Sequence, residues 1–385
     1  MNHVPSIKKI LRKDFPILVI LVVFAAALGT TAAFSDPSAT PDKTASELSA
    51  AELKTLLNEG NVHTMPGYFQ ATSLTLLEAA AGVYDWRFYN LGQLLVEDGL
   101  GNTIIELGRE MNGSWYEWSE QRSPPTEPDA FILAWRQIVT TMRSVPGQHF
   151  KFLWTPYMAQ TSAAEAWPGS GYVDYIGSDI FDWYGGPNSS YPHTVSGALD
   201  HEKKWQQIVN AEPGGLNWVA AFSQATGKPI IIPEWGLDFH TFGGQDDTLF
   251  ITNMMAWMKA HDAIGLYWEQ GHVSAVPTAS GRLLVNQGGS AQTNSPGAVN
   301  AMGDVMGGRL RYAGVYLPDS QWVSDSADEP VLAPWQQAGY QLILSVPIIP
   351  NPPSIPSYSG PPQPGGVPYQ IANYPDAVAA LRKGA

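Results

Sequence analysis

Short apolar runs that alternate with amphipathic segments constrain the fold of this chain most strongly. The runs at residues 102–108, 149–156 and 228–236 are rich in branched aliphatic and aromatic residues and are short. Between the first two of them lies the segment 129–145, whose apolar residues recur at helical spacing. Because this alternation is typical of parallel strands covered by helices, the sequence predicts an α/β fold.

The number of predicted strands indicates a specific α/β architecture. Six strands are predicted from residues 61–69 to residues 263–270, and two more follow at 311–319 and 340–350. Eight parallel strands, each followed by a helix, close into a (β/α)8 or TIM barrel. We therefore expect the chain to form a TIM barrel, to which the C-terminal segment contributes two strands.

Composition excludes several classes of function. The formal net charge is −14, and Lys and Arg cluster only at residues 8–13, so we expect no nucleic-acid partner. The chain has no cysteine, which excludes disulfides and thiol nucleophiles. Its eight His are scattered without a metal-binding spacing. We therefore expect neither a catalytic metal nor a cofactor.

The N-terminus has the pattern of a secretory signal peptide. Basic residues at 8–13 precede an apolar run at 15–29, and small residues follow. We expect a signal peptide over residues 1–34 that is cleaved after Ala33, and a secreted protein with a single catalytic domain over 35–385. The alternative is an uncleaved membrane anchor, although about 15 apolar residues are few for a hydrocarbon core of about 30 Å.

Acidic residues at the ends of predicted strands are the candidates for catalysis. In a parallel barrel, functional side chains lie at the carboxyl ends of the strands. Glu110 and Glu234 each follow an apolar run and are themselves followed by aromatic residues, and Asp179 ends a third run. A lone acid at such a position often only caps a helix, but two with aromatic neighbours favour a catalytic pair. Two carboxyls about 5–5.5 Å apart are suited to retaining glycoside hydrolysis.

The stretch EMNGSWYEW, together with FKFLWTP and PIIIPEWG further along the chain, resembles glycoside hydrolase family 26, which includes β-mannanases. The resemblance extends in consistent order over roughly residues 70 to 275. It implies that Glu110 is the general acid/base and Glu234 the nucleophile. It also places Arg109 where most members carry His, and Glu106 where they usually carry Arg.

The resemblance further implies which side chains contact the sugar. Arg109, next to the acid/base, would hold the nucleophile or a sugar hydroxyl, and Asn112 would shape the loop behind the acid. Members commonly have a Tyr that hydrogen-bonds the nucleophile, but the matching residue here is Phe181, and Tyr184 is the expected substitute. The expected substrate-binding residues are Arg109, Asn112, Trp115, Trp118, Trp154, Asp179, Tyr184, Trp235 and Trp268.

The acid/base occurs unusually early in the chain. Only one predicted strand precedes its strand, whereas the family has three. We therefore expect a circular permutation, in which residues 60–275 supply family strands three to eight and residues 311–350 supply strands one and two. The alternative is a truncated or misassembled reading frame with a separate tail.

Together these features predict a secreted, monomeric, retaining endo-β-glycanase whose partner is a polysaccharide, with β-1,4-mannan favoured. The alternatives are action on another β-glycan, such as mixed-linkage glucan or xylan, and a non-catalytic sugar-binding barrel. The pair Glu110 and Glu234 favours an enzyme, because a binding module has no need of two acids at strand ends.

Overall fold

A computed structural model shows how much of this architecture the chain adopts. The N-terminal segment 1–34 and the expected strand at 61–69 lie outside the residues that the structure describes. No helix of the described part combines the length and the apolar character needed to span a membrane. The described residues are 76–119, 128–158, 163–183, 191–238, 243–267, 283–285, 295–297, 299–300, 310–317 and 328–349.

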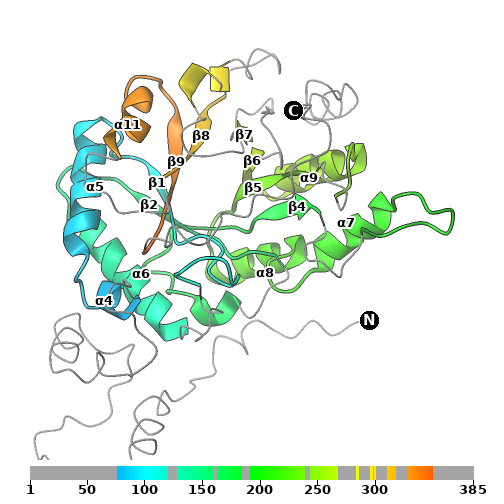
Figure 1. Ribbon diagram of the computed structural model, residues 1–385, viewed down its shortest axis with the longest axis horizontal. Coiled ribbons are helices and arrows are strands. Elements are labelled where there is room, and N and C mark those ends of the chain that lie inside the picture. The colour runs from blue at the N-terminus through cyan, green and yellow to red at the C-terminus, as the bar shows by residue number, and fades with distance from the viewer. Residues whose placement is uncertain are drawn as a thin grey trace, which may run out of the picture.

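The described strands form one sheet in which every neighbouring pair is parallel, and helices surround it (Figure 1). The order in the sheet is β3-β2-β1-β9-β8-β7-β6-β5-β4. The predicted α/β fold with a parallel sheet is therefore confirmed. The strands are β1 (Ile104–Leu107), β2 (Lys151–Trp154), β3 (Tyr175–Ile176), β4 (Ile180–Asp182), β5 (Ile231–Leu237), β6 (Ile264–Tyr267), β7 (Leu283–Val285), β8 (Tyr312–Tyr316) and β9 (Gln341–Val346).

The C-terminal strands lie directly beside the strand that precedes Glu110. β9 pairs with β1, with Ile343 opposite Ile104, and β8 pairs with β9. The other edge of β1 pairs with β2, so both edges of β1 are occupied. The sequence led us to expect residues 61–69 beside β1, but β9 holds that place. The strand β7, between β6 and β8, was not predicted because three apolar residues in a Gly-rich stretch show no periodicity.

The single strand expected over 172–181 is divided into β3 and β4. At Gly177, between them, a Cβ atom would lie 1.9 Å from the carbonyl oxygen of Ile231, so only glycine allows this approach to β5. β3 pairs with β2, whereas β4 pairs with β5, and Ile176 of β3 also forms a bridge with Ile230 just before β5. The divided strand therefore connects β2 with β5.

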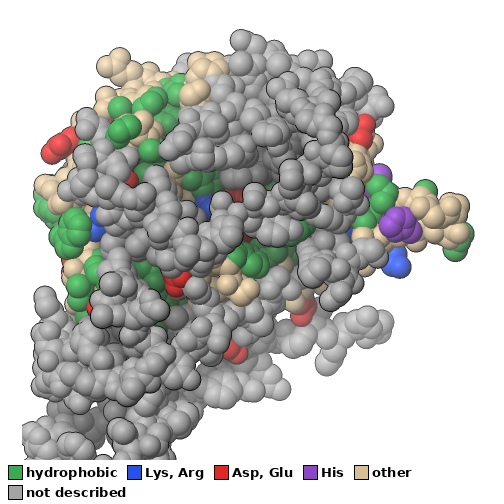
Figure 2. All heavy atoms as spheres, viewed as in Figure 1, with side chains coloured by type: hydrophobic (Ala, Val, Ile, Leu, Met, Phe, Trp, Pro, Cys, Tyr) green, Lys and Arg blue, Asp and Glu red, His purple; other side chains and the backbone are tan. Residues whose placement is uncertain are grey.

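The helices begin and end at recognisable signals. Asp200 and Asp247 cap α7 and α9 by accepting hydrogen bonds from the backbone amides of Lys203 and Phe250. The helices are α4 (Leu76–Ala80), α5 (Asp85–Glu97), α6 (Pro128–Arg143), α7 (His201–Asn210), α8 (Leu216–Thr226), α9 (Thr248–Ala260) and α11 (Glu329–Leu332), with 3-10 turns η2 (Ala163–Ala166) and η4 (Ala333–Trp335). The residues before α7 form a hairpin that projects from the body (Figures 1 and 2). Val195 in this hairpin is fully exposed.

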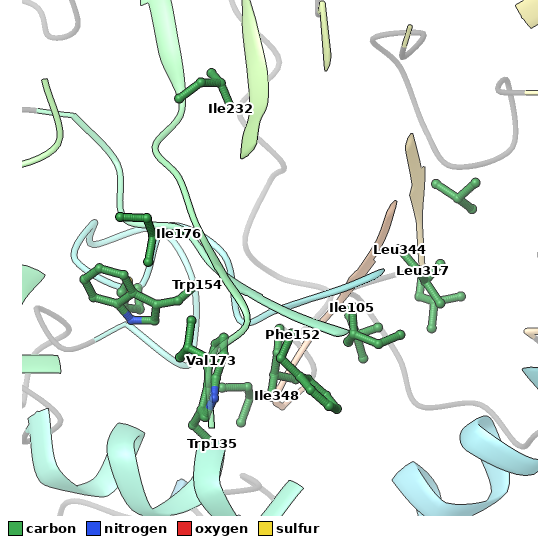
Figure 3. Packing of buried hydrophobic residues seen from close by; sticks show 14 of the residues in the cluster. Ile105, Trp135, Phe152, Trp154, Val173, Ile176, Ile232, Leu317, Leu344 and Ile348 are labelled. Carbon is green, nitrogen blue, oxygen red and sulfur yellow. The ribbon is translucent and has the colours of Figure 1, made fainter. Parts of the chain in front are cut away.

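Side chains from strands far apart in the sequence share one core. Ile105 of β1, Phe152 of β2 and Leu344 of β9 are fully buried and lie close together (Figure 3). A buried ion pair between Arg87 of α5 and Asp328, just before α11, also joins the two ends of the described chain. The C-terminal segment is therefore an integral part of the same hydrophobic core.

Candidate active site

The turn after β1 holds Glu110 in an unusual backbone conformation. Glu110 has φ 51°, which is uncommon for a residue other than glycine and occurs preferentially at functional sites. Its backbone N–H donates to the carbonyl oxygen of Thr155 at 2.8 Å. Gly108, with φ 55°, makes the turn possible, because a Cβ atom there would lie 2.5 Å from Cδ1 of Ile348. The fold thus fixes the position of Glu110 from both flanking strands.

Three carboxyl groups converge at the carboxyl ends of the strands. Glu110 follows β1, Asp179 lies between β3 and β4, and Glu234 lies within β5. One oxygen of each lies within 4.8 Å of one oxygen of each of the others. All three residues are buried, with exposed fractions of 7%, 0% and 6% in that order. The structure therefore brings together the three acids that the strand-end rule selected.

Burial keeps protons on this group of acids. It raises the pKa of Glu110 above its ordinary value, and the charge of Arg109 opposes this shift. It also raises the pKa of Glu234 to about 8, where Arg109 opposes and the charge of Glu110 adds to the rise. The pKa of Asp179 is raised well above its usual range by burial and then by the charges of Glu234 and Glu110. The site can therefore hold a protonated acid at neutral pH, as general acid catalysis requires.

Arg109 supplies the positive charge behind the acids. Its Nε donates to the hydroxyl of Tyr116 at 2.8 Å and its Nη1 donates to Oγ of Ser345 at 3.1 Å. Its described hydrogen bonds thus go to these two hydroxyls, while its charge lowers the pKa of both Glu110 and Glu234. Arg109 therefore acts on the expected nucleophile by charge.

Trp115 and Asn112, in the loop that follows Glu110, have different structural roles. Trp115 is half-buried, and its Nε1 donates to Oε2 of Glu110 at 2.5 Å. Asn112 is completely buried; its side-chain oxygen accepts from the backbone N–H of Tyr157 at 2.7 Å, and its amide donates to the carbonyl oxygen of Tyr157 at 2.9 Å. Trp115 thus contacts the acid itself. Asn112 fixes the shape of the loop through its bonds to Tyr157 and is too deeply buried to contact a sugar. The expectation that Asn112 binds substrate is therefore wrong.

Three of the expected sugar-binding tryptophans belong to the core, which corrects the sequence-based expectation. Trp118, Trp154 and Trp235 have exposed fractions of 2%, 0% and 0%. Trp118 stacks on Tyr116, and Trp154 packs on Phe222. A tryptophan near a strand end can face either the core or the solvent, and the sequence does not distinguish the two. Tyr184 and Trp268 lie outside the described residues.

A substitution at Trp154 distinguishes the core role from a sugar-binding role. We expect Trp154→Ala to lower the free energy of unfolding by about 3–5 kcal/mol, because it leaves a cavity among large aromatic side chains. Trp154→Phe should retain the KM for polysaccharide, since no face of Trp154 is exposed. Chemical denaturation and steady-state kinetics measure the two effects. A fully stable Trp154→Ala variant with a raised KM would contradict the core role.

Two residues of the C-terminal strands reach the site and were not selected from the sequence. The hydroxyl of Tyr316, the last residue of β8, donates to Oε1 of Glu234 at 2.8 Å. Ser345 of β9 accepts from Arg109. The rule that selected Glu110 and Glu234, a polar group at the end of an apolar run, would also have found Tyr316 in the run 311–319 if it had not been restricted to acids.

The buried acids make stability depend on pH in a definite direction. Burial raises the pKa of Glu106 on β1 from 4.5 to about 7, against the opposing charge of Arg109, and that of Glu234 from 4.5 to about 8. A carboxyl whose pKa is higher in the folded state binds more protons there, so the free energy of unfolding falls as pH rises between the two values. We expect the thermal midpoint to be lower at pH 8 than at pH 5, and the difference to shrink in Glu106→Gln. A midpoint that rises over this range would contradict the assignment.

Within the described part of the chain, Glu110, Asp179 and Glu234 are the group whose oxygens lie close enough to share a metal ion. The charge of Arg109, which lowers the pKa of both glutamates, also repels a cation from the same place. The arrangement therefore suits acid–base and nucleophilic chemistry better than metal binding.

Comparison with known proteins agrees with the motifs. Residues 101–212 match the family model described as glycosyl hydrolase family 26, which agrees with the resemblance seen in the sequence motifs. The match includes β1, Glu110 and Asp179 and ends before β5. No curated protein matches the chain.

Several solved structures are similar over part of their length. A Bacillus subtilis mannanase, man26, is 18% identical with a TM-score of 0.34. The similar region covers 64% of this chain and 55% of the mannanase chain. The YdhT protein from Bacillus subtilis is 15% identical with a TM-score of 0.34, over 58% of this chain and 54% of the YdhT chain. An endo-β-1,4-mannanase from Cellulomonas fimi is 19% identical with a TM-score of 0.36, over 51% of this chain and 44% of the mannanase chain. The chain thus spans about half the length of these structures.

Proposed function

We propose that this protein is a secreted retaining endo-β-glycanase, with Glu110 as general acid/base and Glu234 as nucleophile. The observation that carries the proposal is the convergence of Glu110 and Glu234 at the carboxyl ends of β1 and β5, with carboxylate oxygens within 4.8 Å. This spacing suits a mechanism that leaves no room for a water molecule between carboxylate and sugar. The family match over residues 101–212 supports the same class of reaction.

The reaction proceeds in two displacements. First, a carboxylate oxygen of Glu234 bonds to the anomeric carbon while the glycosidic bond breaks and Glu110 donates its proton to the departing oxygen. The result is a glycosyl ester of Glu234. Glu110, now ionised, then takes a proton from a water molecule whose oxygen attacks the anomeric carbon. The ester bond breaks, Glu234 regains its charge and the sugar is released with its original configuration.

The same geometry explains how Glu110 changes role. Two carboxyls this close raise each other's pKa, so the charge of Glu234 favours the protonated form of Glu110 before the first step. Once Glu234 is esterified, its charge is gone and the pKa of Glu110 falls. Glu110 is then ready to act as a base. Trp115, which donates to Glu110, stabilises this ionised form.

For the substrate we propose β-1,4-mannan. The support is the family resemblance of the motif around Glu110, together with the mannanases among the similar structures. The half-buried ring of Trp115, next to the acid, offers an apolar face on which a sugar can stack. Mixed-linkage glucan and xylan are the competing substrates, and the assay below separates them.

For the architecture we propose a (β/α)8 barrel that closes between β3 and β4, with β7, β8 and β9 in the places of the family's first three strands. The parallel neighbours of β1 and the bridge from Ile176 to Ile230 support this closure. The barrel would form a single domain over 35–385, circularly permuted relative to the family. It would be monomeric and would follow a signal peptide over residues 1–34.

The proposal is tested by assaying new reducing ends on mannan, lichenan and xylan in parallel. We expect release from mannan by the wild-type protein, and none by Glu234→Ala at equal concentration. Hydrolysis of lichenan or xylan alone would change the substrate but keep the mechanism. Binding to these glycans without hydrolysis of any of them would contradict the enzyme and favour a sugar-binding barrel.

A further inference from the structure

We propose that Tyr316 is a positioning residue for the nucleophile, and that its hydroxyl holds the Glu234 carboxylate in place and stabilises its ionised form. This inference rests on the proposed role of Glu234 as nucleophile. It assigns a part in the reaction to β8, a strand that lies about a hundred residues beyond the family match at 101–212.

The hydrogen bond joins side chains from two strands that are far apart in the sequence. The Tyr316 hydroxyl donates to Oε1 of Glu234 at 2.8 Å. Among the described residues, Tyr316 is the side chain that donates a hydrogen bond to this carboxylate. Tyr316 ends β8 and lies opposite Ser345 in the register with β9, so the sheet fixes the position of its backbone. A carboxylate held at one oxygen keeps its other oxygen available for attack on the sugar.

Arg109 lies over the ring of Tyr316. The guanidinium carbon lies 4.5 Å from the centroid of the Tyr316 ring, within the range of a cation–π interaction. Arg109 also donates to Ser345, the register partner of Tyr316, so strand β9 anchors the guanidinium. A positive charge beside a phenol makes its hydroxyl a better donor. Arg109 therefore strengthens the bond to Glu234 without touching that carboxylate in the described structure.

This bond has an electrostatic task that the burial of the site creates. Burial and the charge of Glu110 raise the pKa of Glu234, which works against a nucleophile that must be ionised. The Tyr316 hydroxyl lowers the pKa of Glu234, because it donates to the charged form. The other ionisable groups whose charges interact with Glu234 are Glu106, Arg109, Glu110, Tyr116, Tyr157 and Asp179.

The variant Tyr316→Phe tests this role because it removes the hydroxyl but keeps the ring beside Arg109. We expect kcat/KM on mannan to fall by about 10- to 100-fold, the effect of one hydrogen bond to a charged group. We expect the loss in kcat, with KM little changed. Losing a donor to the ionised carboxylate raises its pKa, so the acid limb of the kcat/KM profile should move to higher pH.

The matched control is Tyr312→Phe, the same change four residues earlier on β8. Tyr312 is half-buried and lies at the opposite end of the strand, opposite Gln341. The Tyr312→Phe substitution should leave kcat, KM and the acid limb of the kcat/KM profile unchanged. Thermal unfolding of both variants, with midpoints within about 2–4 °C of the wild type for a loss near 1 kcal/mol, shows that each is folded.

A readout independent of activity completes the test. In protein labelled with carboxyl-¹³C glutamate, the signal that disappears in Glu234→Gln reports the titration of Glu234. It should titrate at higher pH in Tyr316→Phe than in the wild type. Equal rates and equal titration curves in an active wild type would overturn this inference alone. An inactive wild type would overturn the proposed function, and the titration would still decide whether Tyr316 stabilises ionised Glu234.

Discussion

Replacing Glu234 by Ala is expected to lower kcat on mannan by on the order of 10⁴-fold or more, the scale of losses seen when a nucleophile is removed. The substitution removes the atom that forms the glycosyl ester in the proposed mechanism. Added azide should restore cleavage of an activated aryl β-glycoside, because the small anion fits the vacated space. The product should be the α-glycosyl azide, identified by NMR.

The control for this variant is Glu97→Gln, which removes a carboxyl at the exposed end of α5. It should retain the activity and the thermal midpoint of the wild type. If Glu234→Ala keeps more than a tenth of the wild-type activity while Glu97→Gln behaves as expected, Glu234 is not the nucleophile.

Replacing Glu110 by Gln has a different expected signature, because only the proton donor is lost. On polysaccharide we expect a fall of about 10²–10⁴-fold, the usual contribution of general acid–base catalysis. With a dinitrophenyl glycoside, whose leaving group needs no proton, formation of the glycosyl ester should remain fast while its hydrolysis is slow. A rapid burst of dinitrophenol followed by slow turnover measures this directly. Added azide should give the β-glycosyl azide.

The comparison of the two substrates provides the control within one protein. Glu110 has a backbone φ of 51°, so a substitution there could also disturb the turn after β1. A disturbed turn would reduce activity on both substrates equally and lower the thermal midpoint. Equal losses without a burst would therefore contradict the acid/base role.

The positions of the candidate catalytic acids could be predicted from the sequence because a local pattern encodes them. Each of Glu110, Asp179 and Glu234 follows an apolar run, and parallel strands present their carboxyl ends at one side of a sheet. That rule brings together residues more than a hundred positions apart without any knowledge of loops. The family motif around Glu110 added the expected roles.

The remainder of the site depends on contacts that no local pattern encodes. Tyr316 meets Glu234 only because β9 pairs with β1 and β8 with β9, and this order is a property of the whole sheet. The burial of Trp154 depends on α8, which supplies the Phe222 that it packs against. Similarly, Gly177 divides a predicted strand because of the close approach of β5. Each difference arises from non-local packing.

The stereochemistry of hydrolysis tests the central claim, the pairing of Glu110 and Glu234 in a retaining mechanism, most directly. Proton NMR recorded during the first minutes of hydrolysis of a manno-oligosaccharide by the wild-type protein distinguishes the two anomers before they interconvert. A retaining mechanism predicts that the β-anomer forms first and the α-anomer appears later by mutarotation. Initial formation of the α-anomer would contradict it, because an inverting enzyme forms no glycosyl ester on Glu234.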